Sequence, residues 1–117
     1  MNWNKLNQID QIDQIKASSK EQPVLIFKHS TRCSVSSMAE NRLERAWNAD
    51  EVPSISLFHL DLIQHRDISQ ALATTFDVAH ESPQVLIIFN GTCVYHDSHM
   101  GISYQEIKKT VEGLSVA

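Results

Sequence analysis

The chain has 117 residues, of which 42% are apolar, and this is enough to bury one hydrophobic core but not two. Its ten basic and fourteen acidic residues give a formal net charge of -4, which argues against a surface that follows nucleic-acid phosphates. No apolar run reaches the roughly 18 residues of a membrane-spanning helix, and the polar N-terminus does not fit a secretory signal. We therefore expect one domain over residues 1–117, soluble and cytoplasmic, with neither nucleic acid nor membrane as a partner.

A helix, a linker and a strand are expected first. Near the N-terminus apolar residues recur at every third position, a period that fits a helix and not a strand: Leu6, Ile9, Ile12 and Ile15. Residues 16–23 are then predicted to be a linker, because they combine small and polar residues with Pro23. The nearly all-apolar run 24–28 is predicted to be a strand that is buried on both faces of a sheet.

A second helix is predicted from Ser34 over about fourteen residues, because apolar residues return at three- and four-residue steps: Val35, Met38, Ala39, Leu43, Ala46 and Trp47. Its outer face is expected to be charged and to include Glu40. A strand over 54–62 follows, and then a short helix that a capping box of Asp67 and Gln70 would open.

The last predicted elements are two strands and a helix. A strand over 84–90 leads into Asn90-Gly91, the strongest short hairpin signal, and a strand over 92–96 follows. A capping box of Ser103 and Glu106 would open the final helix. Right-handed crossovers and the hairpin together predict an α/β fold with a four-stranded mixed sheet, flanked by four helices. Two of its strands are parallel and come from a βαβ unit, and the other two form a C-terminal antiparallel hairpin.

The stretch TRCSVS places Cys33 where the first strand ends and the next helix begins. Unpaired N–H groups and the positive end of the helix dipole are expected to face its sulfur. Arg32 adds a cation, and Ser36, one turn later, can offer a hydroxyl to the same sulfur. All of these effects favour a thiolate, so Cys33 is the candidate nucleophile and Ser36 its catalytic neighbour.

A second candidate segment is Ser82-Pro83, just before the third strand. An X-Pro peptide at a strand start can be cis, and its preceding backbone groups then point outward, free to pair with an extended thiol ligand. Taken alone, a trans loop proline fits the sequence equally well.

The order of elements resembles the thioredoxin fold over the whole chain, with TRCSVS as a Cys-x-x-Ser active site and ESP as the cis-proline loop. More narrowly, KHSTRCSVS, LDLIQHRDIS and HESPQVLIIFNG resemble the bacillithiol-system bacilliredoxin family of the YtxJ type, some of whose members are labelled general stress proteins. That family usually has a proline after the cysteine, where this chain has Ser34.

This resemblance implies an enzyme with a one-cysteine cycle that reduces mixed disulfides between client proteins and a low-molecular-weight thiol such as bacillithiol. The small thiol would be a co-substrate, and no bound cofactor is expected. Arg32, Ser34, Ser82 and Pro83 are the expected substrate-binding residues. Arg32 could pair with a carboxylate of the small thiol, although an arginine exposed to solvent fits at least as well.

The second cysteine, Cys93, is expected near the opposite pole of the fold. The strand from Gln84 carries the chain roughly 20 Å away from Pro83 before the hairpin turns, whereas a disulfide needs Cα atoms within about 7 Å. We interpret Cys93 as a packing residue, with an intermolecular disulfide under oxidation as the alternative.

Six histidines raise the question of a metal site: His29, His59, His65, His80, His96 and His99. No pair has HxxxH or HxxH spacing next to a cysteine pair, so no metal is expected. His29 and His80 could lie close to the thiolate and tune it, or could make ordinary loop hydrogen bonds. For Asp61, a turn or capping role is favoured over acid/base chemistry.

Two function classes fit the sequence. The first is the thiol-disulfide oxidoreductase described above. The second is a non-catalytic thioredoxin-like adaptor or stress-response binding module in which Cys33 is incidental. The dependence of the iodoacetamide reaction rate of Cys33 on pH would separate them, because only a redox thiol needs to react as a thiolate at low pH.

Overall fold

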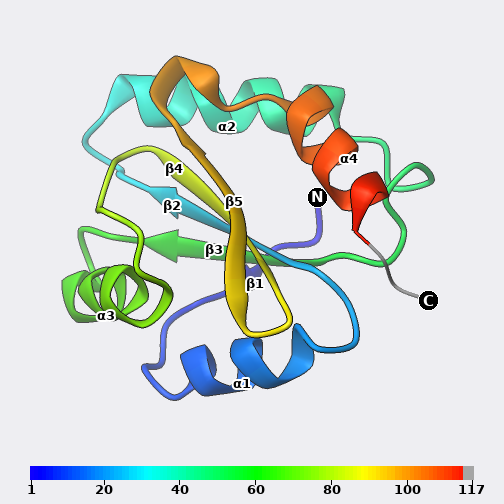
Figure 1. The fold of residues 1–117 in the computed structure, drawn as a ribbon. Helices are drawn as coiled ribbons and strands as arrows, with labels where there is room; N and C mark the ends of the chain where they lie inside the picture. The colour runs from blue at the N-terminus through cyan, green and yellow to red at the C-terminus, as the bar shows by residue number, and fades with distance from the viewer. Residues whose placement is uncertain (115–117) are drawn as a thin grey trace.

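In the computed structural model, which describes residues 1–114, the strands form one five-stranded mixed sheet with helices on both faces (Figure 1). Residues 115–117 of the predicted domain lie outside the described residues. The sheet order is β1-β3-β2-β4-β5, with β1 and β2 parallel to β3, β4 antiparallel to β2, and β5 antiparallel to β4. The strands are β1 (Asn4–Lys5), β2 (Val24–His29), β3 (Ser56–Asp61), β4 (Gln84–Phe89) and β5 (Thr92–Ser98).

The prediction of four strands was wrong by one, because β1 adds an edge strand. Asn4 and Lys5 pair with β3, and the N–H of Leu6 continues the pairing by donating to the carbonyl of His59 at 2.9 Å. Both residues of β1 are exposed, and a two-residue polar strand has neither an apolar run nor an alternating pattern. The sequence therefore carried no signal for it.

The four predicted α-helices are present within residues 1–114, and none of these helices is both long and apolar enough to cross a membrane. Their bounds are α1 (Gln11–Ser18), α2 (Ser34–Ala46), α3 (Arg66–Phe76) and α4 (Tyr104–Gly113), with a short 3-10 helix, η1 (His99–Gly101), before α4. Helix α1 starts later than predicted and runs on into the predicted linker. Of the predicted apolar stripe, Leu6 is buried ahead of the helix and Ile9 is 52% exposed.

The two predicted capping boxes did not form as expected. His65, not Asp67, is the N-cap of α3, and Asp67 lies in the first turn of that helix. Ser103 is the N-cap of α4, as predicted, but its side chain makes no capping hydrogen bond. The local pattern thus located both helices but not the hydrogen bonds at their ends.

Helix α2 turns a different face to the sheet from the one predicted. Val35 and Met38 were expected to face inward, yet Val35 is 36% exposed and Met38 is 57% exposed. The buried positions are instead Ser36, Ala39 and Leu43. A polar residue therefore occupies the inward position one turn after Cys33, and two apolar side chains stay at the surface beside it.

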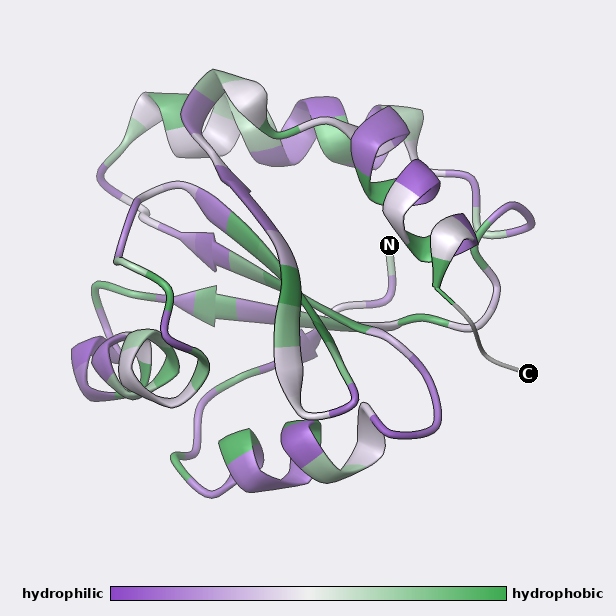
Figure 2. Ribbon diagram, in the orientation of Figure 1, coloured by the Kyte–Doolittle hydropathy of each residue, from purple (hydrophilic) through white to green (hydrophobic). Residues whose placement is uncertain are grey.

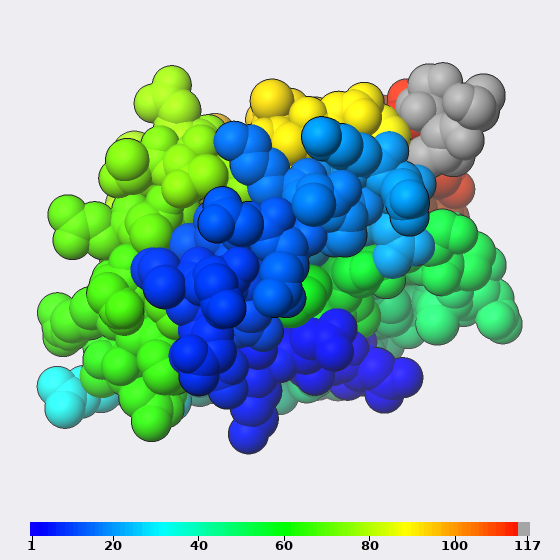
Figure 3. All heavy atoms as spheres, turned by 90° about the horizontal axis from the view of Figure 1, so that it is seen from below, coloured from blue at the N-terminus to red at the C-terminus, as the bar shows by residue number. Residues whose placement is uncertain are grey.

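Two apolar clusters fill the space between the sheet and the helices. Alternate residues of β2 enter each one: Val24 and Ile26 face α1 and α3, whereas Leu25 and Phe27 face α2 and α4. Figure 3 views the first of these faces, where α1 (blue) lies beside α3 (green). The central strands are accordingly the greenest part of Figure 2, and β2 is buried on both sides as its apolar run predicted.

The predicted Asn90-Gly91 hairpin is confirmed. Both residues have positive φ, 54° and 76°, the conformation that a tight hairpin turn requires and that asparagine and glycine tolerate best. A bulge between Ile87 and Ile88 shifts the register of β5. As a result Cys93 packs into the cluster with α1 and α3, and Tyr95 packs into the other cluster.

Candidate functional site

Cys33 lies at the junction of β2 and α2, the position that the sequence predicted. It is the N-cap of α2 with an extended backbone, and its carbonyl accepts the N–H groups of Ser36 and Ser37 at 3.1 and 3.3 Å. The thiol is free, is partly exposed and makes no capping hydrogen bond. Cys33 therefore lies at the positive end of the α2 helix dipole.

Ser36 ties the first turn of α2 to the end of β2. Its side chain is buried, its Oγ lies 2.6 Å from Nδ1 of His29, and it accepts the backbone N–H of Ser30 at 3.1 Å. The sequence suggested that this hydroxyl would turn to the sulfur of Cys33. Its hydrogen bonds go to His29 and Ser30 instead. Ser36 therefore fixes the loop that carries Cys33 to the end of β2.

His29 contacts the first turn of α2 through the hydroxyl of Ser36. Burial is the main cause that lowers its pKa, Glu40 and Asp61 oppose the change, and His59 adds to it. A lowered pKa keeps the imidazole neutral at physiological pH. A neutral ring has one donor and one acceptor nitrogen, so Nδ1 can either donate to the Ser36 hydroxyl or accept from it, according to the tautomer.

The Ser82-Pro83 segment lies at the same end of the sheet as Cys33. Lys28 of β2 pairs with Gln84 of β4, so Pro83 comes beside the residue at which β2 ends. The Ser82-Pro83 peptide bond is cis, and the carbonyl of Pro83 accepts the N–H of His99 at 3.0 Å. Among residues 1–114, the hydroxyl of Ser82 is buried without a hydrogen-bond partner. A buried oxygen without a partner is rare in folded proteins and marks this segment as unusual.

Arg32 and Ser34 flank Cys33 in the sequence, and both are exposed. The backbone N–H of Arg32 donates to Oγ of Ser30 at 3.4 Å, and this bond anchors the loop before Cys33. The loop with Arg32 and Ser34 and the Ser82-Pro83 segment thus lie at the same end of the sheet. Their contacts with a substrate stay a prediction.

Lys28 is a buried residue of this end that the sequence reasoning missed. Its side chain is 1% exposed, and Nζ lies 2.7 Å from Nδ1 of His80 and donates to Oε1 of Gln84 at 3.1 Å. Burial lowers the pKa of Lys28 to about 8, against the opposing charge of Glu81. Burial, and then Lys28, lower the pKa of His80 as well. His80 therefore contacts Lys28. The sequence feature that could have indicated this pair is a lysine inside an otherwise apolar strand.

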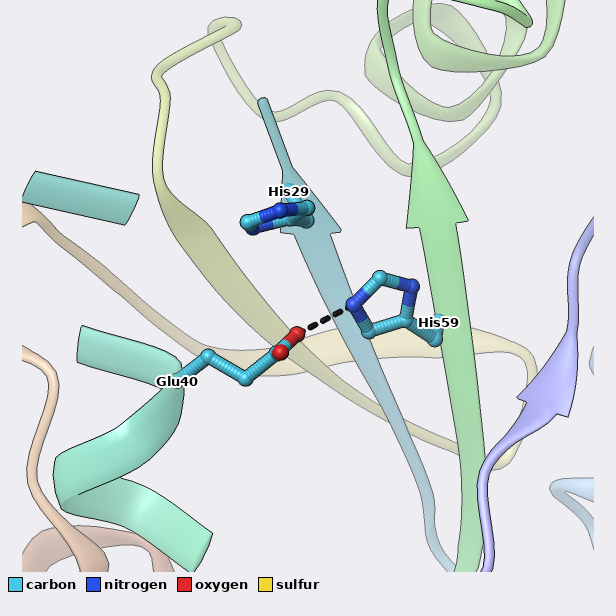
Figure 4. A group of neighbouring side chains, drawn as sticks. All are labelled: His29, Glu40 and His59. Atoms are coloured by element: carbon cyan, nitrogen blue, oxygen red, sulfur yellow. Dashed lines mark hydrogen bonds and ion pairs between the residues drawn. The ribbon is translucent and has the colours of Figure 1, made fainter. Parts of the chain in front are cut away.

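A second group of polar residues lies on the α2 side of the sheet (Figure 4). Nε2 of His59 bonds to a carboxylate oxygen of Glu40, and His29 lies beside the pair. One nitrogen or oxygen from each of the three residues lies within 4.8 Å of the others, so this group could hold a metal ion. The sequence placed Glu40 on the outer face of α2, but its side chain is only 24% exposed and turns to the sheet.

Asp61 and Cys93 have the surroundings that the sequence predicted. Oδ1 of Asp61 accepts the backbone N–H groups of Ile63 and Gln64 at 3.1 and 3.2 Å, so its turn role is confirmed. Cys93 pairs with Ile88, which places it roughly 16 Å along the sheet from Pro83. Its thiol is free, bonds to the carbonyl of Tyr95 at 3.2 Å, and has its pKa raised by burial.

Comparisons with known proteins agree with this geometry. The sequence model of the family described as monothiol bacilliredoxin BrxC matches residues 4–107. Among solved structures, a protein described as having a thioredoxin fold is 29% identical, with a TM-score of 0.76 over 91% of this chain and 90% of that one. The thioredoxin of Fasciola hepatica is 16% identical, with a TM-score of 0.68 over 93% and 96% of the two chains. That of Malassezia sympodialis is 14% identical, with a TM-score of 0.70 over 95% and 89%. The fold is therefore thioredoxin-like.

Proposed function

The chain belongs to the monothiol bacilliredoxin family, and on that premise we propose that it removes a bacillithiol-type thiol from mixed disulfides on client proteins. Membership of the family and the thioredoxin-like fold support a thiol-oxidoreductase function in general. The observation that carries the more specific proposal is Cys33, a free and partly exposed thiol at the start of α2. A small thiol is the co-substrate that such a reaction requires.

The proposed first step is attack by the Cys33 thiolate on the small-thiol sulfur of the mixed disulfide. A new S–S bond forms between Cys33 and the small thiol, the old S–S bond breaks, and the client cysteine leaves as a thiolate that takes a proton from water. In the second step the thiolate of another small-thiol molecule attacks the sulfur bound to Cys33. This step frees Cys33 and yields the disulfide of the small thiol, so the electrons that reduce the client come from two small-thiol molecules.

Neither of the two residues that stand in place of a resolving cysteine, Ser36 and Cys93, suits that role, and this supports a one-cysteine cycle. Ser36 stands where a second active-site cysteine would stand, and its oxygen cannot form a disulfide. Cys93 packs against the apolar cluster at the far end of β4, well beyond the separation that a disulfide allows. Release of the adduct therefore falls to an external thiol.

The proposed substrate groove lies between the Cys33 loop and the Ser82-Pro83 segment. The unpartnered hydroxyl of Ser82 supports a polar contact with the small thiol or with the client backbone. The exposed side chains of Arg32 and Ser34 border the same site, and a guanidinium group suits the carboxylates of a bacillithiol-type thiol. A cysteine that must stay reduced between cycles also fits a cytoplasmic location.

The test is to incubate the reduced protein with a bacillithiol mixed disulfide of a client peptide and to determine the mass of the product. We expect one small-thiol adduct, located on Cys33 by peptide mapping, and release of the free peptide. Cys93→Ser is the matched control and should form the same adduct. An internal disulfide in place of the adduct, or an adduct confined to Cys93, would overturn the proposal. Neither product, together with an ordinary alkylation rate at Cys33, would favour the adaptor function.

A further inference from the structure

Three residues from three separate elements converge beside the Cys33 loop. His29 ends β2, His59 lies in β3 and Glu40 reaches over from α2, so that their ring nitrogens and carboxylate meet above the sheet (Figure 4). One potential ligand atom from each lies within 4.8 Å of the other two. Ligand atoms around a tetrahedral ion at bond lengths of about 2.0–2.2 Å are roughly 3.5 Å apart, so small side-chain rotations would complete the geometry.

The combination of donors selects the kind of ion. Two imidazoles and one carboxylate form a mixed nitrogen and oxygen set that suits Zn²⁺, whereas Mg²⁺ and Ca²⁺ favour sites made of oxygen ligands. Zinc sites with three protein ligands keep a fourth position for water or a substrate. The ligand set of His29, Glu40 and His59 matches this pattern.

Neighbouring side chains hold the two imidazoles in place, as the partners of metal ligands commonly do. Nδ1 of His29 lies 2.6 Å from the Ser36 hydroxyl, and in the tautomer that carries its proton on Nδ1 the ring donates to this hydroxyl and keeps the lone pair of Nε2 for an ion. The ring of His59 stacks on Phe27, with centroids 5.9 Å apart and planes within 9°. Trp3 contacts the same His59 ring edge-on, at 5.5 Å between centroids.

The cluster is open to ions in solution. The side chains of His59 and Glu40 are 22% and 24% exposed. His29 and His59 line a surface pocket of about 520 Å³, to which Asp61 and His65 also contribute. Water in this pocket can fill the remaining coordination position, and an ion can reach the cluster without unfolding of the sheet.

From this geometry we propose that His29, Glu40 and His59 form a Zn²⁺ site with a fourth, solvent position. The ion replaces the hydrogen bond between His59 and Glu40, and His59 binds as a neutral imidazole with its proton on Nδ1 and the lone pair of Nε2 on the ion. The spacing of these residues in the sequence, 11 and 19 positions apart, matches no short metal motif, so the site exists only once β2, α2 and β3 have packed. It does not depend on the thiol chemistry of Cys33.

The test is calorimetric titration of Zn²⁺ into protein without a histidine tag, in a Cys33→Ser/Cys93→Ser background that removes both thiols as competing ligands. We expect one ion per chain. Glu40→Gln and His59→Gln should each weaken binding about tenfold or more, because even loss of a residue that only supports a metal ligand costs about 10–100-fold in affinity. Glu81→Gln is the matched control, because Glu81 also pairs with a histidine, His99 at 3.5 Å, and should leave the affinity unchanged.

Two outcomes would overturn the site. One is the absence of Zn²⁺ binding in the cysteine-free protein, which would reduce the cluster to a hydrogen-bonded pair beside a third imidazole. The other is binding that Glu40→Gln and His59→Gln leave unchanged, which would place the ion elsewhere on the chain. If His59→Gln does not fold, Glu40→Gln decides the question, since this substitution is isosteric and circular dichroism can confirm the fold.

Discussion

The two ends of the central sheet differ in their chemistry, although β2 and β4 run the full distance between them. At the end where β2 finishes, which we call the redox end, polar side chains gather on both faces of the sheet: Lys28, His29, Ser36, His80, Ser82 and Gln84. At the opposite end, the hairpin end, the Asn90-Gly91 turn is held by hydrogen bonds to Ser19 and Cys93 packs against apolar residues.

This difference indicates at which end of the sheet buried polar groups lower the stability of the fold. Burial of a polar group costs free energy unless the group is paired, and even a paired group gains little over an apolar one. The hairpin end buries one neutral polar side chain, Ser19, whose hydroxyl is hydrogen-bonded. The redox end buries a lysine, Lys28, as well as Ser36, and leaves the Ser82 hydroxyl unpaired among residues 1–114. A fold that breaks the rule at one end only is expected to carry its function there.

The comparison predicts opposite results for the same substitution at the two cysteines. Cys33→Ser should reduce turnover of a client mixed disulfide to the uncatalysed rate, because a serine hydroxyl does not attack disulfides. Cys93→Ser should keep most of the activity, because that thiol packs at the hairpin end. The measurement is the rate of small-thiol release, followed by mass spectrometry, with thermal unfolding as a check on the fold.

Two results would break the distinction between the ends. Activity retained by Cys33→Ser would exclude a thiol mechanism at the redox end. Activity lost in a folded Cys93→Ser protein would give the hairpin end a catalytic part that its half-buried, hydrogen-bonded thiol does not suggest.

Lys28 carries the next largest expected effect, on stability. Lys28→Ala removes a buried side chain and leaves His80 and Gln84 without their partner, which should cost about 2–4 kcal/mol of unfolding free energy. Lys28→Met is the matched variant, since it fills a similar volume without a charge. Its unfolding free energy in urea should be close to that of the wild type. If alanine is tolerated as well as methionine, the buried volume of the Lys28 side chain contributes nothing to the packing of the redox end.

The lowered pKa of Lys28 predicts how the unfolding free energy changes with pH in the alkaline range. Burial lowers the pKa of Lys28 from 10.5 to about 8, so between these values the unfolded chain binds more protons than the folded one. The unfolding free energy should therefore rise with pH in this window, by about 2 kcal/mol between about pH 8 and pH 10. Lys28→Met should lack this contribution, and the difference between the two urea midpoints cancels groups that titrate in both proteins.

How far the sequence predicted each end follows from the kind of signal involved. Apolar periodicity and the Asn90-Gly91 signal are local, so the four main strands, the four helices and the hairpin were predicted with errors at their ends. The cysteine at the start of α2 was local too. Contacts between elements are harder to predict from the sequence. Ser36 and Glu40 are four residues apart on one face of α2, but nothing in the sequence indicates that their partners are His29 and His59. The two-residue strand β1 left no trace at all.

Ser36→Cys sharpens the comparison within the redox end. The substitution restores a Cys-x-x-Cys pair across the first turn of α2, so the oxidised protein should form an internal disulfide in place of a stable small-thiol adduct. It also replaces the two hydrogen bonds of the buried hydroxyl, which should cost about 1–2 kcal/mol in the reduced protein. Mass spectrometry of the oxidised protein separates the two products. A persistent adduct of unchanged lifetime would mean that residues 33 and 36 cannot bring their sulfurs together.

Gly91→Ala carries the smallest expected effect and probes the hairpin end alone. Gly91 has φ of 76°, where an alanine is strained, although a Cβ there would meet only the side chain of Lys16 at 3.5 Å. The backbone N–H of residue 91 can still donate to Oγ of Ser19, a bond of 2.9 Å in the wild type. The variant should therefore lose about 1 kcal/mol of unfolding free energy through backbone strain. Turnover should be unchanged, because the strain arises at the end of the sheet far from Cys33, and a matching loss of turnover in the folded variant would show that the two ends are coupled.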